Sequence, residues 1–147
     1  MKRKFYGFLS VCLSFLCALC LFACDRKDKS NLVCLLVESN QTRVVISVSQ
    51  PGQNCTLLDC MEILKQREDN FTYTMFNGMI TSINGVENPA DFSKCWMLYT
   101  SDAEMANTAW GKIEYNSETL GSAVVGAVDL EVIAGGIYVW DYNYINF

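Results

Sequence analysis

Two Asn-Gly dipeptides constrain the fold of this chain more than any other feature. They lie at 77–78 and 84–85, on either side of the short segment 79–83, which has apolar residues at 79, 80 and 83. Residues 71–75 before them alternate apolar with polar side chains. Asn-Gly is the strongest short-range signal for a two-residue β-hairpin, because both residues tolerate the positive φ that such turns require. The middle of the chain is therefore predicted to form short antiparallel strands.

Similar patterns predict strands elsewhere in the chain. Alternating or short apolar runs occupy residues 32–37, 43–48, 94–100, 128–132 and 137–145, and a shorter one lies around Ile113 and Tyr115. The Pro-Gly-Gln-Asn sequence at 51–54 is expected to end the second of these strands.

One helix is predicted, beginning after Thr56. Thr56 and Asp59 have the spacing of a capping box, and apolar residues at 57, 61 and 64 fall on one helical face. Asp59 is therefore interpreted as a cap and not as a catalytic acid. The pattern favours an α+β fold in which one helix packs on an antiparallel or mixed β-sheet.

The first 23 residues have the features of a lipoprotein signal peptide. Three basic residues at 2–4 precede the apolar run 5–22, and the following Leu-Phe-Ala-Cys sequence resembles a bacterial lipobox. Cys24 would then carry a lipid, residues 24–31 would be a tether, and residues 32–147 would form the domain. We expect a lipid-anchored protein on the outward face of a cell membrane. A transmembrane helix at 5–22 is the alternative interpretation.

Charge and cysteine content narrow the class of protein further. The chain has 11 basic and 16 acidic residues, and loss of the signal peptide would remove three basic ones, which argues against nucleic-acid binding. After the signal peptide and Cys24, four cysteines remain, at positions 34, 55, 60 and 95. Outside the cytoplasm they permit up to two disulfides in three connectivities. The spacing does not specify the pairing, and one or both of Cys55 and Cys60, which flank the predicted helix start, would join the helix to the sheet through Cys34 or Cys95. A zinc site is not expected, because the four cysteines after Cys24 include no CxxC pair and the chain has no histidine.

The sequence favours a protein that is not an enzyme. Without histidine, the usual general base at neutral pH and the base of Ser-His or Cys-His pairs are missing. The acidic residues at 102, 104, 129 and 131 show no spacing that marks a catalytic pair, and no phosphate-binding or EF-hand motif is present.

An aromatic row is predicted on the last strand, where Tyr138, Trp140, Tyr142 and Tyr144 share one face. Cross-strand or core packing is the favoured interpretation of this row. A platform for a flat apolar ligand or for sugar rings is the alternative.

Three segments resemble a known family in their order and spacing. They are Thr56-Leu57-Leu58-Asp59, the stretch 82–100 with its Asn-Gly turn, and Gly126-Ala127-Val128-Asp129-Leu130 before the closing strand. Together they resemble the C-terminal β-domain of the transcobalamin and intrinsic-factor family. They are equally similar to DUF4430, a bacterial domain often found on surface lipoproteins.

The resemblance implies a grasp-like fold and one wall of a cobalamin site. By this resemblance, the ligand-binding residues would be Trp96, Met97, Leu98, Tyr99, Thr100, Gly126, Ala127, Val128, Asp129 and Leu130. The family's helical domain, which supplies the opposite wall, has no counterpart in this sequence. We therefore expect a second protein to complete the site, a different ligand, or a protein partner.

These observations lead to one main hypothesis and two alternatives. The main one is a surface lipoprotein that captures a ligand, with a corrinoid as the candidate and an uptake system as partner. The alternatives are an adhesion module that docks a protein through a sheet edge or aromatic face, and a disulfide-stabilised inhibitor of a secreted protease.

Overall fold

The computed structural model describes residues 28–144. The predicted signal peptide, the lipid site at Cys24 and residues 24–27 of the predicted tether lie outside the described residues. The first strand, β1 (Asp28–Ser39), begins four residues before the position predicted for it, so that residues 28–31 belong to the sheet.

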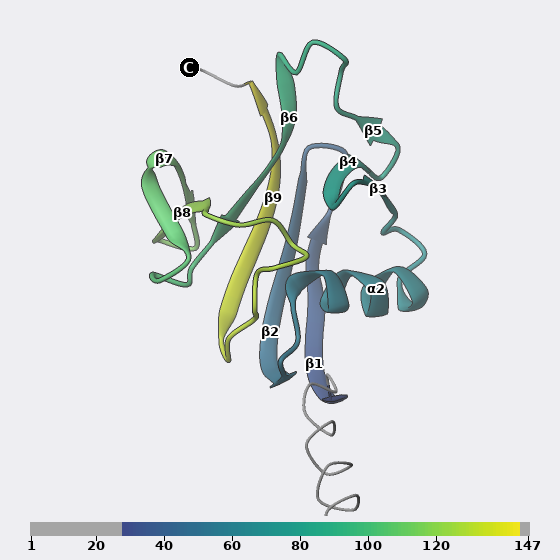
Figure 1. The fold of residues 1–147 in the computed structure, drawn as a ribbon, viewed down its shortest axis with the longest axis vertical. Helices are drawn as coiled ribbons and strands as arrows, with labels where there is room; N and C mark the ends of the chain where they lie inside the picture. Colours follow the sequence, from purple (N-terminus) through teal and green to yellow (C-terminus); the bar gives the residue numbers. More distant parts are fainter. Residues whose placement is uncertain (1–27, 145–147) are drawn as a thin grey trace, which may run out of the picture.

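The main structural element is a six-stranded antiparallel sheet (Figure 1). In spatial order its strands are β1, β2 (Arg43–Gln53), β9 (Gly136–Tyr144), β6 (Lys94–Thr100), β8 (Glu118–Ala123) and β7 (Ala106–Tyr115). The predicted alternation of β2 is confirmed, since Val44, Ile46 and Val48 are fully buried in one core cluster while Val45 belongs to another on the opposite face.

A second, three-stranded sheet contains β3 (Tyr73–Phe76), β4 (Met79–Ile83) and β5 (Val86–Glu87). Both predicted Asn-Gly turns are confirmed. All four of their residues have positive φ, with 49° and 80° at residues 77 and 78 and 50° and 78° at residues 84 and 85. These angles match the turn type whose twist suits antiparallel strands.

The helix α2 (Leu57–Arg67) packs beside β1, on the same side of the large sheet as the small one (Figure 1). Its predicted apolar stripe is confirmed, because Leu57, Met61 and Leu64 are fully buried in the main core cluster. Residues of β7 and β8, including Leu120, pack in a smaller cluster on the opposite face. The described residues thus form a mostly antiparallel β structure with a single short helix.

The helix begins where the capping box predicted. The backbone N–H of Thr56 donates to Asp59 Oδ2 at 2.9 Å, so the expected capping role of Asp59 is confirmed. The carbonyls of Leu130 and Ala127 accept hydrogen bonds from Leu57 and Leu58 at 2.8 and 2.9 Å. The amides that a helix normally leaves unpaired at its start are therefore satisfied within the protein.

Three sequence-based assignments need correction. Residues 128–132 are predicted as a strand, but they form a turn and a loop. Within the described part of the chain, their one ladder contact is an isolated bridge from Glu131 to Thr56. Strand β7, at Ala106–Tyr115, is longer than the short strand predicted around Ile113. Strand β2 continues through Pro51, where the sequence predicts its end. Beyond Val48, β1 is the one strand of the described residues that pairs with β2. A proline can be accommodated there, because its missing backbone N–H leaves no donor that a second neighbouring strand would have to accept.

Candidate functional site

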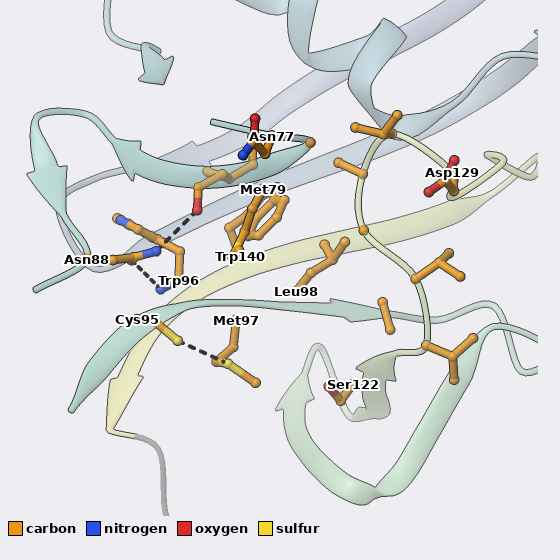
Figure 2. A pocket seen from close by; sticks show the side chains of 18 of the residues that line it. Asn77, Met79, Asn88, Cys95, Trp96, Met97, Leu98, Ser122, Asp129 and Trp140 are labelled. Carbon is orange, nitrogen blue, oxygen red and sulfur yellow. Dashed lines mark hydrogen bonds between the residues drawn. The ribbon is translucent and has the colours of Figure 1, made fainter. Parts of the chain in front are cut away.

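A pocket of about 530 Å³ lies beside β6, between the small sheet and the segment that follows β8 (Figure 2). Two sequence segments far apart in the chain meet there. The predicted binding residues that line the pocket are Trp96, Met97, Leu98, Gly126, Ala127, Val128 and Asp129. The structure thus brings together most of the two segments that the resemblance marked.

The pocket exists because β6 is only partly paired on one of its sides. Its β9 side is paired from Lys94 to Thr100, whereas its β8 side is paired only through Tyr99 and Thr100. After Ala123 the chain leaves the sheet and turns toward the helix. On that side, residues 94–98 have no neighbouring strand among the described residues, and the pocket occupies this gap.

Trp96 is fixed in the wall of the pocket by polar contacts at both ends. Its indole Nε1 donates to the Val86 carbonyl at 2.8 Å, and its backbone N–H donates to Asn88 Oδ1 at 3.0 Å. The Asn88 amide also donates to the Ile80 carbonyl at 3.1 Å, so that this one side chain joins β6 to the small sheet (Figure 2). Only 5% of Trp96 is exposed, which gives the wall a rigid aromatic component.

The rim of the pocket combines exposed apolar side chains with a single charge. Met79 and Phe92 line it although 59% and 55% of their surfaces are exposed. Of the lining residues that the structure describes, Asp129 is the one with a charged side chain. Burial raises the pKa of Cys95, so that this group is a neutral thiol, 3.5 Å from Met97 Sδ. A pocket of this composition suits binding better than acid–base chemistry.

The other three predicted binding residues lie elsewhere. Tyr99 belongs to the cluster on the opposite face of the sheet. Thr100 is fully buried, and its hydroxyl accepts a hydrogen bond from the Asp102 N–H at 3.0 Å. Leu130 is fully buried in the main core. None of the three lines the pocket.

The sequence did not point to several residues that form the site. Met79, Asn88 and Phe92 line the pocket from the small sheet and from the loop before β6. They carry no local pattern that distinguishes them from ordinary turn or strand residues. Trp140 also lines it, and here the sequence did give a signal, because this residue belongs to the predicted aromatic row.

The aromatic row of β9 is mainly a packing feature, as the favoured interpretation held. Tyr138 is fully buried, and its hydroxyl accepts a hydrogen bond from the Ile133 N–H at 2.9 Å. Tyr142 lies against Trp96 with ring centroids 5.3 Å apart. Trp140 is 5% exposed, and its buried indole N–H has no hydrogen-bond acceptor among residues 28–144. Tyr144 is the exception, with 71% of its surface exposed.

Three further features bear on the predicted chemistry of the chain. Within residues 28–144, no group of three or more Cys, Asp or Glu side chains is placed so that it could hold a metal ion. The four cysteines of this part of the chain are buried and form no disulfide with one another. None of its helices has the length and apolar character needed to cross a membrane.

Comparison of the chain with protein-family models, with curated proteins and with solved structures found no match. The resemblance to the transcobalamin β-domain stays a prediction.

Proposed function

We propose that this protein is a surface lipoprotein that binds a ligand and catalyses no reaction, and that the pocket beside β6 is its binding site. The observation that supports this proposal is the convergence of residues 96–98 and 126–129 on one pocket. Its volume of about 530 Å³ falls within the range of roughly 300–1,000 Å³ that is common for small-molecule sites.

The lining favours a ligand with a flat or branched apolar surface and few charges. Trp96 and Trp140 supply aromatic surface, and Met79 and Phe92 supply exposed apolar surface at the rim. Such surface gains free energy when it is removed from water. The carboxylate of Asp129 favours a ligand that is neutral or carries a donor group on that side.

A corrinoid is the specific ligand that we propose, on a transcobalamin-like fold. A complete cobalamin is larger than this pocket, so the protein would enclose one edge of the corrin ring. A second chain would then cover the remainder, as an uptake partner of a lipid-anchored capture protein would do.

The three tryptophans allow a direct test of this proposal. Trp96 and Trp140 line the pocket, whereas Trp110 on β7 is 65% exposed and lies outside it. In a Trp110→Phe background, titration with cobinamide or cobalamin should quench the fluorescence of the two pocket tryptophans. N-acetyltryptophanamide corrects for absorption by the corrinoid, and calorimetry measures the affinity independently.

Gly126 offers a variant that blocks the pocket with little effect on the fold. Among residues 28–144, a Cβ at this position would have one neighbour within 4 Å, the Gly78 carbonyl oxygen at 3.9 Å. Gly126→Leu should fill the space and weaken binding by roughly tenfold or more, equal to about 1.4 kcal/mol. Ala109→Leu, at an exposed position of β7, is the matched control and should bind normally. Absence of binding at about 1 mM of either corrinoid would remove the corrinoid proposal.

A second candidate function is the docking of a protein partner on β1. This strand is at the edge of the large sheet, and Val33, Leu35 and Val37 on one of its faces are 50%, 59% and 47% exposed. Exposed apolar residues on an edge strand are typical of surfaces that add a strand from another chain. If crosslinking in intact cells captures a partner, Leu35→Lys should abolish capture and leave corrinoid binding unchanged.

A further inference from the structure

Two buried thiols face each other between β1 and α2. Cys34 lies on β1 and is 4% exposed, and Cys60 lies in the first turns of α2 and is fully buried. The Cys34 thiol is 3.8 Å from the Cys60 carbonyl oxygen, and the two thiols also hydrogen-bond each other. Arg67, at the end of the same helix, donates to the Cys34 carbonyl at 3.0 Å and holds the helix against the strand.

Strand register places Cys95 beyond the reach of these thiols. Cys34 pairs with Val48, which pairs with Gly136 at the start of β9. Cys95 pairs with Asn143, near the end of the same strand. Gly136 and Asn143 mark the positions of Cys34 and Cys95 along β9, and these positions are roughly 23 Å apart at about 3.3 Å per residue. The Cα atoms of two disulfide-linked cysteines lie within about 7 Å of each other.

This distance reduces the number of possible disulfides. Each of the three connectivities that contain two disulfides requires Cys95 to pair with one of the other three cysteines. Cys55 is no nearer to Cys95, because its thiol lies 3.6 Å from the Asp28 carbonyl at the opposite end of the sheet. Within residues 28–144, a single disulfide among Cys34, Cys55 and Cys60 is the most that the fold accommodates.

We propose that Cys34 and Cys60 form this disulfide when the protein meets a small-molecule disulfide such as oxidised glutathione. The Cys34 thiolate attacks one glutathione sulfur, forms a mixed disulfide and releases one glutathione thiolate. Cys60 then loses its proton to solvent, attacks the Cys34 sulfur and releases the second glutathione. Two protein thiols are oxidised to one disulfide, and one glutathione disulfide is reduced to two thiols.

The electrostatics support this order of attack. Hydrogen bonding to Cys60, with a further contribution from Arg67 and against the effect of burial, lowers the pKa of Cys34 to about 7. The same hydrogen bond and burial raise the pKa of Cys60. Thiol–disulfide exchange is fastest for an attacking thiol whose pKa is near the ambient pH. Cys34 is therefore the better first nucleophile and Cys60 the resolving thiol.

Peptide mapping of the full-length protein tests the pairing without any substitution. After oxidation with glutathione disulfide and alkylation under denaturing conditions, trypsin and Asp-N separate Cys34, in peptide 30–43, from Cys60, in peptide 59–65. Cys55 falls in peptide 44–58. The expected product is a disulfide-linked pair of peptides 30–43 and 59–65, with Cys55 and Cys95 alkylated. Two fully alkylated peptides, or any crosslink that contains another cysteine, would overturn the proposal.

A stability measurement gives a second, independent readout. The disulfide would close a loop between residues 26 apart in sequence, so the oxidised protein should melt roughly 10 °C above the reduced one. Cys55→Ser should keep this difference, and Cys60→Ser should abolish it. An equal melting temperature for the oxidised and reduced wild-type protein would also contradict the inference. The proposal is independent of the function assigned to the pocket.

Discussion

Asp59 offers the sharpest test of how α2 is attached to the sheet. Only 7% of its surface is exposed, and its carboxylate accepts hydrogen bonds from the Thr56 N–H at 2.9 Å and the Thr56 hydroxyl at 3.1 Å. It also forms an ion pair of 2.8 Å with Lys29 at the start of β1, which raises the pKa of Lys29. One side chain thus joins the helix start to the first strand.

The cost of Asp59→Ala can be estimated from these contacts. Loss of a helix cap costs about 1 kcal/mol. Leaving the buried Thr56 N–H without its charged acceptor costs roughly 1–2 kcal/mol more. The ion pair adds less than about 1 kcal/mol, because 48% of the Lys29 side chain is exposed to solvent. We therefore expect Asp59→Ala to lower the free energy of unfolding by about 2–3 kcal/mol.

Two companion variants separate the cap from the ion pair. Asp59→Asn keeps an oxygen acceptor and loses the charge, so it should cost about 1 kcal/mol. Lys29→Met removes only the ion pair and should cost less than about 1 kcal/mol. Urea denaturation followed by circular dichroism measures all three. A cost below about 0.5 kcal/mol for Asp59→Ala, or a cost of Lys29→Met equal to that of Asp59→Ala, would contradict the role assigned to this carboxylate.

Two further predictions concern stability. Gly121→Ala should lower the free energy of unfolding by roughly 2 kcal/mol in urea denaturation, because the added Cβ would lie 2.9 Å from the Ala106 Cβ. Gly85→Ala should lower it by about 1 kcal/mol, because its added Cβ meets no described atom within 4 Å but its φ is 78°. Equal costs for the two variants would contradict the packing argument. Burial raises the pKa of Tyr138 from 10.0 to about 12. The stability that Tyr138 contributes should therefore be complete below pH 10 and fall by up to about 3 kcal/mol as the pH rises toward 12. Urea denaturation at pH 9 and pH 12 should show a smaller loss for Tyr138→Phe than for the wild type, and an equal loss would contradict the argument.

Local sequence patterns predicted most of the strands because the signals that define them act over a few residues. The two Asn-Gly turns form as predicted, since their φ preference is a property of the residues themselves. The β7–β8 hairpin was recognised only in part. Its turn is made by Asn116 and Ser117 at φ of 48° and 66°, a pair without the glycine that normally signals such a turn.

The alternation at 128–132 misled for a different reason. Leu130 and Val132 are buried, as a half-exposed strand would require, but they are buried around the start of the helix and not in a sheet. Their backbone groups bond to Leu57 and Cys55. Periodicity reports which side chains avoid water and cannot report which backbone groups are their partners.

The sequence by itself determined the local units of this protein: the hairpins, the helix with its cap, and the alternating faces of β2, β6 and β9. Only the tertiary structure decided that β9 lies between β2 and β6, that β8 pairs with only the end of β6, and that the gap left there is lined by residues 96–98 and 126–129. Turn and capping preferences depend on neighbouring residues. A pocket depends on the register between strands that are distant in sequence, and that register is set by how the whole core packs.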